Sequence, residues 1–258
     1  MGLIYLKAVG VIGTHKSGKT TLVENLVRRL VEKGFKVATI KSIYHTRIDI
    51  VGKDSWRHGN AGAEETILYA DEEVFRILRH KYRLYEVVNM LRNYDYLVLE
   101  GLSTLKNFYG VRIVTAKSIE EARNLIDSLT IAVSGLVSNI TNKIEFNGKI
   151  IPVYSSIDDM DKILDLVLKN SFKPPYGYNC GECRYKNCLS LAESILRGEA
   201  KPEECVYLKK NEVILNIDGK SIGLNPFVQN LLKNILMGFI STLKGVDSPR
   251  EVFIKISL

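Results

Sequence analysis

The chain has 258 residues, with 36 Lys and Arg against 29 Asp and Glu and a formal net charge of +7. This length allows a substantial buried core and more than one domain. The densest basic group, residues 76–83, has no aromatic-interleaved binding motif around it, so we expect no nucleic-acid partner. The sequence has no apolar stretch of membrane-spanning length and no secretory signal before the first strand. We therefore expect a cytoplasmic protein without a membrane partner.

Residues 5–12 form an apolar run that predicts a buried strand, and a complete phosphate-binding loop follows it. Glycines let the backbone N–H groups of such a loop turn toward phosphate oxygens, and the N-terminus of the helix predicted over residues 20–31 adds positive potential. We expect Lys19 to reach the β- and γ-phosphates of a nucleotide and the Thr20 hydroxyl to bind Mg²⁺. The predicted nucleotide-binding residues are Gly13, Thr14, His15, Lys16, Ser17, Gly18, Lys19, Thr20 and Thr21.

Strands and helices alternate after the loop. Apolar runs predict strands over residues 37–40, 96–99, 131–137 and 151–154, and helical patterns lie over residues 84–91, 118–125 and 158–168. This alternation predicts an α/β fold with a doubly wound, mostly parallel sheet covered by helices on both faces. Ligands of such folds bind at the carboxyl ends of the strands, where the phosphate-binding loop also lies.

A magnesium ion beside a phosphate-binding loop needs acidic side chains to hold its water shell. Glu100 is the first candidate, because it ends the strand predicted over residues 96–99. Asp49 and Asp54 follow the second strand and are candidates for a second carboxylate, with loop capping as an equal alternative for each. The only glutamine, Gln229, lies far from the loop in sequence. Without a water-positioning glutamine or an arginine finger, we expect weak nucleotide hydrolysis at most.

The segment after the second predicted strand contains Lys41, Gly52 to Ser55 and Ala61 to Ala63, and Glu100-Gly101 follows the third. Together with the phosphate-binding loop, these residues resemble the molybdopterin-guanine dinucleotide biosynthesis protein B family, with Ser42 and Val51 in place of a histidine and a proline of the family pattern. The resemblance covers residues 4–169. It implies a GTP-binding adapter, often dimeric, that works beside the guanylyltransferase joining GMP to molybdopterin, with weak or no GTPase activity. The residues it places near the pterin or the nucleotide are Lys41, His45, Lys53 and Ser55.

All four cysteines follow a linker that contains two prolines and a glycine, over residues 170–179. They are Cys180, Cys183, Cys188 and Cys205. Such a cluster in a cytosolic chain indicates a metal site rather than disulfides. Four thiolates suit zinc or an iron–sulfur cluster. Because the second Cys-x₂-Cys pair of a typical zinc site is missing, we favour a 4Fe–4S cluster and keep zinc as the alternative.

The cysteine spacing also resembles the small 4Fe–4S domain of Rnf-type electron-transport subunits and corrinoid iron–sulfur proteins. The residues that carry this resemblance are Cys180-Gly181-Glu182-Cys183, Cys188, Ala192, Gly198 and Cys205, with Arg184 in place of a common glycine. Redox use and structural use of the cluster are equally open. So short a segment cannot bury a core of its own, so loss of metal should unfold residues 171–210.

The C-terminal residues predict a small α+β unit. Residues 213–217 and 221–224 read as a hairpin, Asn225-Pro226 opens a helix that ends near residue 243, and residues 252–256 read as a closing strand. We therefore divide the chain into a P-loop GTP-binding domain (1–170), a four-cysteine iron–sulfur domain (171–210) and a C-terminal unit (211–258). Two alternative functions stay open, a metallochaperone GTPase and a nucleotide-gated iron–sulfur electron-transfer protein.

Overall fold

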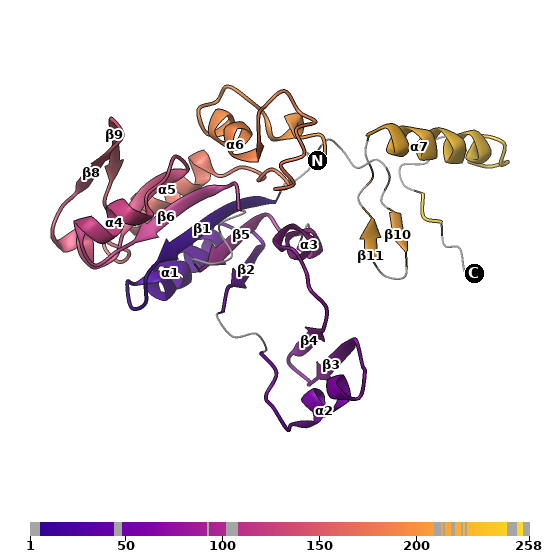
Figure 1. Cartoon of the computed structure of the whole chain (residues 1–258), viewed down its shortest axis with the longest axis horizontal. Helices are drawn as coiled ribbons and strands as arrows, with labels where there is room; N and C mark the ends of the chain where they lie inside the picture. Colours follow the sequence, from indigo (N-terminus) through magenta and orange to yellow (C-terminus); the bar gives the residue numbers. More distant parts are fainter. Residues whose placement is uncertain are drawn as a thin grey trace.

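A five-stranded parallel sheet forms the centre of the protein in the computed structural model (Figure 1). The structure describes residues 6–43, 48–91, 93–101, 108–208, 213, 215–217, 220–222, 224, 226–246 and 252–254. The sheet order is β2-β5-β1-β6-β7. Its strands are β1 (Lys7–Gly13), β2 (Val37–Lys41), β5 (Tyr96–Glu100), β6 (Val111–Thr115) and β7 (Thr130–Ser134). All five residues of β5 are buried, as expected of a strand in a sheet that is covered on both faces.

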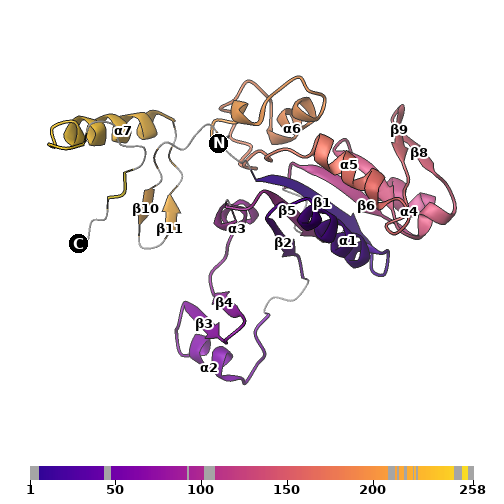
Figure 2. The ribbon, with the colours of Figure 1, turned by 180° about the vertical axis from the view of Figure 1, so that it is seen from behind.

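Helices cover both faces of this sheet (Figures 1 and 2). Helices α1 (Lys19–Glu32) and α5 (Met160–Asn170) pack on one face, and α3 (Leu84–Met90) and α4 (Ile119–Leu125) pack on the other. Leu22, Leu26 and Leu30 of α1 are fully buried, and each contributes about 1.5–3 kcal/mol to stability. The predicted α/β fold with a parallel, doubly wound sheet is therefore confirmed.

The strands of the central sheet differ from the sequence prediction in two places. Strand β6, which pairs with β1 and β7 inside the sheet, was not predicted, because Arg112 interrupts its short apolar run. The strand predicted over residues 151–154 does not join the sheet as a full member. It forms as β9 (Lys149–Pro152), which pairs antiparallel with β8 (Lys143–Phe146) and keeps only a single parallel bridge, Val153 to Val133. Between β7 and β8, a 3₁₀ turn spans Leu136–Asn139.

The segment between β2 and α3 forms a small unit of its own, which we call the excursion (residues 48–79). It contains α2 (Asp54–Asn60) and an antiparallel hairpin of β3 (Glu65–Tyr69) and β4 (Val74–Leu78). The helix and the hairpin lie apart from the central sheet in both views (Figures 1 and 2). The hairpin exposes five large apolar side chains, Ile67, Leu68, Tyr69, Val74 and Phe75.

The cysteine-bearing residues 171–208, which we call the cysteine module, pack against the edge of the sheet at which β1 begins. The module contains α6 (Cys188–Leu196) and a 3₁₀ turn over Pro202–Glu204. The backbone N–H of Ala8 donates to the carbonyl of Phe172 at 3.2 Å, and Ala192 belongs to the hydrophobic core that also contains α1 and α5. The module is thus continuous with the core of the nucleotide-binding domain.

The C-terminal residues form the predicted hairpin and helix. The hairpin consists of β10 (Leu215–Ile217) and β11 (Lys220–Ile222), and the helix is α7 (Pro226–Ile240). The predicted closing strand is wrong for residues 252–254, which have no regular secondary structure, and residues 255–256 lie outside the described part. Within the part of the chain that the structure describes, no helix is both long and apolar enough to span a bilayer.

Candidate nucleotide site and cysteine cluster

The phosphate-binding loop connects the carboxyl end of β1 to the first turn of α1. Gly18 has φ +96°, and Lys16 has φ +58°, a left-handed conformation that few non-glycine residues adopt. The buried Ser17 side chain donates to the Thr14 carbonyl at 2.9 Å and lies 2.8 Å from Thr115 Oγ1 at the end of β6. Strand, loop and helix N-terminus therefore have the arrangement that phosphate binding requires, and β6 fixes the loop from one side.

Gly135, which follows β7, lies directly against this loop. Its φ is +93°, and a Cβ at this position would lie 2.4 Å from the Ser17 carbonyl oxygen. Gly34 has a similar φ of +86°, but a Cβ there would meet nothing within 4 Å. Alanine at either position would adopt a left-handed backbone at a cost of about 1–2 kcal/mol, and only at Gly135 would the side chain also displace the loop.

We predict that Gly135→Ala lowers the free energy of unfolding by more than Gly34→Ala does, and that it alone weakens nucleotide binding. Chemical denaturation of the two variants gives the first comparison, and nucleotide titration gives the second. Equal effects of the two substitutions would show that the close contact between Gly135 and Ser17 contributes neither to the free energy of unfolding nor to nucleotide affinity.

Glu100 is placed beside the first turn of α1, as the sequence predicted from its strand-end position. The Thr20 hydroxyl donates to Glu100 Oε1 at 3.1 Å, and Lys41 Nζ lies 3.3 Å from the same oxygen. The Glu100 side chain is 10% exposed. A hydroxyl and a carboxylate at this spacing provide the oxygen ligands and second-sphere contacts that Mg²⁺ prefers. The structure thus brings Thr20, Glu100 and Lys41 together at one edge of the sheet.

Lys19, the lysine of the loop, donates from Nζ to the Thr14 carbonyl. Burial lowers the pKa of Lys19, while the carboxylates of Glu100 and Glu121 act in the opposite direction. The ammonium group therefore lies in the concave side of the loop, where phosphate oxygens replace backbone carbonyls as partners in phosphate-binding loops.

Glu121 of α4 contacts the loop, although no pattern in the sequence predicts this contact. Its Oε1 accepts a hydrogen bond from the Thr14 hydroxyl, and its Oε2 accepts one from the Lys117 N–H at 2.9 Å. Burial acts to raise the pKa of Glu121, but these hydrogen bonds and the Lys117 charge outweigh it, so the pKa lies below its usual value. Lys117 Nζ in turn donates to the His15 carbonyl at 3.3 Å. An ionised carboxylate therefore borders the phosphate position.

The Ser118-x-x-Glu121 spacing is the sequence signal that was available for this residue. It is the spacing of a helix cap, and Ser118 Oγ does accept from the Glu121 N–H at 3.2 Å. Because capping accounts for a glutamate at this position, the sequence alone offers no further role for it. Only the fold reveals that its carboxylate reaches Thr14, 107 positions away in the chain.

We predict that Glu121→Gln strengthens nucleotide binding, because it removes a negative charge next to the phosphates and keeps a hydrogen-bond acceptor for Thr14. A partly exposed charge contact of this kind is worth about 0.5–1 kcal/mol, which corresponds to an affinity about two- to fivefold higher. Calorimetric titration with GTP and Mg²⁺ at low salt measures it. Glu120→Gln, an exposed neighbour on α4, is the control. Weaker binding by Glu121→Gln would instead assign the carboxylate to holding the loop or the metal.

The remaining predicted carboxylates belong to the excursion in this structure. Asp49 accepts from Ser55 Oγ at 2.7 Å and forms an ion pair with Arg79 at 2.9 Å. The hydrogen bond from Ser55, together with Arg79, lowers the pKa of Asp49. Asp54 is the first residue of α2, and its side chain is 88% exposed. Both carboxylates therefore lie with α2 rather than beside the phosphate-binding loop.

Two further predicted contact residues are also found in the excursion, and one lies outside the described residues. Lys53 precedes α2 as its N-cap residue, and Ser55 donates to Asp49. His45 is among the residues that the structure does not describe. Of the four side chains predicted to approach a pterin or a nucleotide, Lys41 is the one that the structure places next to Glu100.

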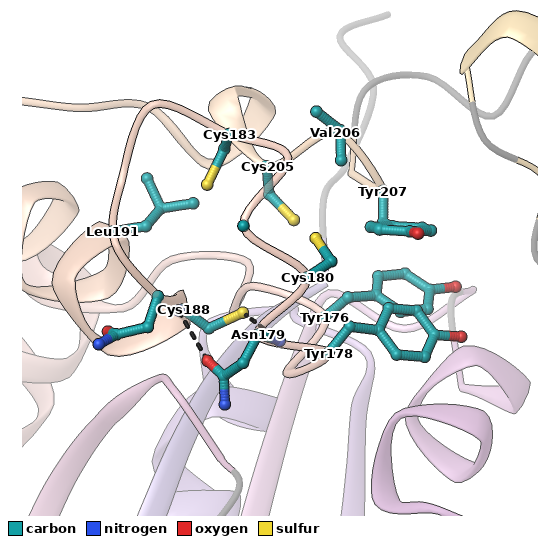
Figure 3. A pocket seen from close by; sticks show the side chains of 12 residues that line it. Tyr176, Tyr178, Asn179, Cys180, Cys183, Cys188, Leu191, Cys205, Val206 and Tyr207 are labelled. Atoms are coloured by element: carbon teal, nitrogen blue, oxygen red, sulfur yellow. Dashed lines mark hydrogen bonds between the residues drawn. The ribbon is translucent and has the colours of Figure 1, made fainter.

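The four cysteines line one pocket in the cysteine module (Figure 3). Cys188 opens α6, Cys205 follows the 3₁₀ turn, and Cys180 and Cys183 come from the turn before α6. All four thiols are free, and their sulfurs face a common space. Within the described ranges, no three His, Cys, Asp or Glu side chains are grouped closely enough to hold one metal ion. A 4Fe–4S cluster does not require such convergence, because each thiolate binds a different iron.

Cys188 is a buried thiol with backbone hydrogen-bond donors. It is 7% exposed, and burial raises its pKa, while backbone N–H groups of Asn179 and Gly177 act to lower it. The Asn179 N–H donates to Cys188 Sγ at 3.4 Å, and Asn179 Oδ1 accepts from the Cys188 N–H at 2.9 Å. Buried sulfur with amide donors is a suitable environment for a thiolate ligand of an iron–sulfur cluster.

A group of tyrosines borders the cysteine pocket on one side. Their ring centroids lie 4.6–6.0 Å apart, and three of the rings appear as neighbours of Cys180 in Figure 3. The group consists of Tyr85, Tyr176, Tyr178 and Tyr207. The sequence predicted a linker over residues 170–179 from its prolines and glycine, and it gave no signal that the tyrosines of this linker pack beside the cysteines.

The fold and the phosphate-binding loop define a P-loop nucleotide-binding protein. The profile of the family described as "Molybdopterin guanine dinucleotide synthesis protein B" matches residues 8–138, and that of the family described as "Putative Fe-S cluster" matches residues 176–207. The "Putative molybdopterin-guanine dinucleotide biosynthesis adapter protein" of Methanocaldococcus jannaschii is 30% identical over 260 aligned positions, covering 98% of each chain. The chain therefore belongs to the molybdopterin guanine dinucleotide synthesis protein B family.

Two further relatives match shorter parts of the chain. The "Molybdopterin-guanine dinucleotide biosynthesis adapter protein" of Haemophilus influenzae is 43% identical over 65 residues, 25% of this chain and 36% of that protein. The crystal structure of Bacillus subtilis MobB has a TM-score of 0.50 at 24% sequence identity, and the match covers 64% of this chain and 97% of that one. This structural likeness supports the fold alone.

Proposed function

We propose that the protein is a GTP-binding adapter in molybdopterin guanine dinucleotide biosynthesis, with weak or no intrinsic GTPase activity. The observation that carries the proposal is the pairing of Thr20 and Glu100 beside a complete phosphate-binding loop, in a chain that belongs to this family. The full-length relative from Methanocaldococcus jannaschii bears the name of an adapter in the same pathway, which supports the same role here.

The nucleotide would be held as Mg·GTP by the residues of the loop. Thr20 would bind the metal ion, Glu100 would hold its water shell, and Lys19 would contact the β- and γ-phosphates. A second carboxylate from the excursion, Asp49 or Asp54, would have to approach the loop from its present position. Slow hydrolysis follows from the same residues, because they neutralise phosphate charge but supply no group that orients an attacking water.

The cysteines would hold a 4Fe–4S cluster, a carrier of single electrons, with zinc as the alternative metal. Three observations support the cluster: the match of residues 176–207 to an iron–sulfur family profile, the four sulfurs around one pocket, and the amide donors at Cys188. The chemistry of the donor set fits, because four thiolates are the usual ligands of such a cluster.

Molybdopterin and the guanylyltransferase would be the partners of the adapter, and a second copy of the chain would complete a homodimer. The exposed hairpin of the excursion supports a protein contact, because both of its faces expose apolar side chains on an element that lies outside the core. Ile67, Tyr69 and Val74 lie on one face, and Leu68 and Phe75 lie on the other. We assign the dimer contact to this hairpin. Sedimentation analysis of Tyr69→Ser and Phe75→Ser variants tests the assignment.

The experiment that tests the proposed function is retention of the pterin. Protein purified without oxygen is passed over a sizing column with molybdopterin or its guanine dinucleotide, with and without GTP and Mg²⁺. Co-elution that depends on GTP is the expected result. A protein that binds GTP and retains neither pterin contradicts the adapter function.

A second candidate function is a nucleotide-gated electron-transfer protein. It is favoured by one observation, which is that β6 and the residues just before it contact both sites. Tyr109, before the start of β6, accepts a hydrogen bond from Asn179 of the cysteine module, and Thr115, at the end of β6, is hydrogen-bonded to Ser17 of the phosphate-binding loop. This function requires a reversible redox couple whose midpoint potential changes with GTP and no affinity for molybdopterin. The same retention experiment therefore separates the two functions.

A further inference from the structure

Asn179 makes three hydrogen bonds at the junction between the cysteine module and the central sheet. Its backbone N–H donates to Cys188 Sγ at 3.4 Å, and its Oδ1 accepts from the Cys188 N–H at 2.9 Å, as the dashed lines in Figure 3 mark. Its Nδ2 donates to the Tyr109 hydroxyl at 3.0 Å. One residue therefore contacts a predicted cluster ligand through both its backbone and its side chain, and contacts the nucleotide-binding domain as well.

The backbone conformation of Asn179 explains how these contacts are compatible. Its φ is +49°, in the left-handed region, which asparagine tolerates better than most residues because its short side chain bonds locally. Gly177, two residues earlier, has φ +80°. The resulting turn directs the Asn179 N–H at the sulfur and leaves the side-chain amide free to reach both the first N–H of α6 and Tyr109.

Tyr109, which holds this turn through its hydroxyl, is fixed in the hydrophobic core. It is 9% exposed, belongs to the core that contains α1 and α5, and lies two residues before β6. Strand β6 pairs with β1 from Val111 to Thr115. The Asn179 side chain is therefore bonded to a buried core residue that leads directly into a central strand of the sheet.

We propose that Asn179 is a positioning residue for the cluster ligand Cys188, and that it couples this ligand to β6 through Tyr109. The inference rests on the proposal that the four cysteines hold a 4Fe–4S cluster. An N–H donor at a ligand sulfur stabilises the reduced, more negative state of a cluster more than the oxidised state, so it raises the reduction potential. A turn that moves away from Cys188 should therefore lower the potential of the cluster.

Three variants of the full chain test the proposal. Asn179→Gly removes the side chain and keeps a residue that adopts positive φ without strain. Tyr109→Phe removes only the hydroxyl that Asn179 contacts. Tyr185→Phe is the matched control, because it removes a hydroxyl inside the module that bonds Glu204 and Arg184 and does not contact Asn179. Each protein is reconstituted with iron and sulfide, its iron content is measured, and the midpoint potential is determined by a redox titration followed by electron paramagnetic resonance.

The expected result is a more negative potential for Asn179→Gly, a smaller shift in the same direction for Tyr109→Phe, and an unchanged potential for Tyr185→Phe, all at equal iron content. Potentials that match the wild-type value in both Asn179→Gly and Tyr109→Phe would overturn the proposal. A shift in Asn179→Gly alone would overturn the coupling to β6. Wild-type protein that takes up no iron and sulfide would contradict the proposed cluster itself, which distinguishes that failure from a failure of Asn179.

Discussion

Replacement of Lys19 by alanine is expected to reduce the affinity for GTP by a factor of roughly a hundred, since charge-assisted hydrogen bonds to the phosphates worth about 3 kcal/mol are lost. The fold should persist, because the hydrogen bond of Lys19 in the structure is local, to the Thr14 carbonyl of the same loop. Calorimetric titration with GTP and Mg²⁺ measures the loss, and thermal denaturation without nucleotide shows whether the fold is intact.

Lys33→Ala is the matched control for this substitution. Lys33 is the C-cap residue that follows α1 at its opposite end, so the net charge changes equally while the loop is untouched. Wild-type affinity is expected for Lys33→Ala. An equal loss of affinity in both variants would mean that the overall charge of the protein, rather than the position of Lys19, governs nucleotide binding.

The parts of the site that could be predicted from the sequence are those that depend only on residues close together in the chain. The loop needs its glycines, lysine and hydroxyl at fixed spacing, and Glu100 ends an apolar run that predicts a buried strand. The helix predicted over residues 118–125 is likewise local, because the hydroxyl of Ser118 at its start accepts from a backbone N–H three residues later. These predictions required no knowledge of which strands pair.

The parts that could not be predicted depend on pairing between distant segments. Strand β6 is short and contains Arg112, so it gains its burial only from β1 and β7 on either side. Glu121 reaches Thr14 only because β6 pairs with β1, so that α4, which follows β6, lies next to the loop. Asp49 belongs to the segment that carries the family resemblance. Its ion pair with Arg79 could not be predicted, because Arg79 lies 30 residues further along the chain.

The two predicted sites lie at opposite ends of the parallel strands of the central sheet. The phosphate-binding loop follows the end of β1, whereas Phe172 of the cysteine module contacts Ala8 near its beginning. A strand of this length spans about 20 Å. A cluster in the module would therefore not touch a nucleotide or a pterin at the loop, and any influence of one site on the other has to pass through the sheet. Strand β1 contacts both sites directly, and β6 is a second connection, with Tyr109 before its start and Ser17 beside its end.

This separation makes Cys188→Ser an informative substitution. Serine is similar in size to cysteine, so the buried position at the start of α6 loses little packing, but the hydroxyl is a poor ligand for iron. We expect the variant to lose the cluster and the cysteine module to open, because so few residues bury too small a core to stay folded without metal. Binding of GTP should be retained, because the loop lies at the other edge of the sheet.

Limited proteolysis, with the iron content measured in parallel, tests this expectation. Cleavage within residues 171–208 should become at least about tenfold faster in Cys188→Ser, which corresponds to a loss of about 1.4 kcal/mol in the free energy of local opening. Leu189→Ala is the control, since Leu189 is the next residue of the same helix and is 37% exposed. Unchanged protease resistance in Cys188→Ser would mean that contacts with the nucleotide-binding domain, such as Phe172 with Ala8 and Asn179 with Tyr109, hold the module without its cluster. The cluster would then be dispensable for folding, which would leave electron transfer as its remaining use.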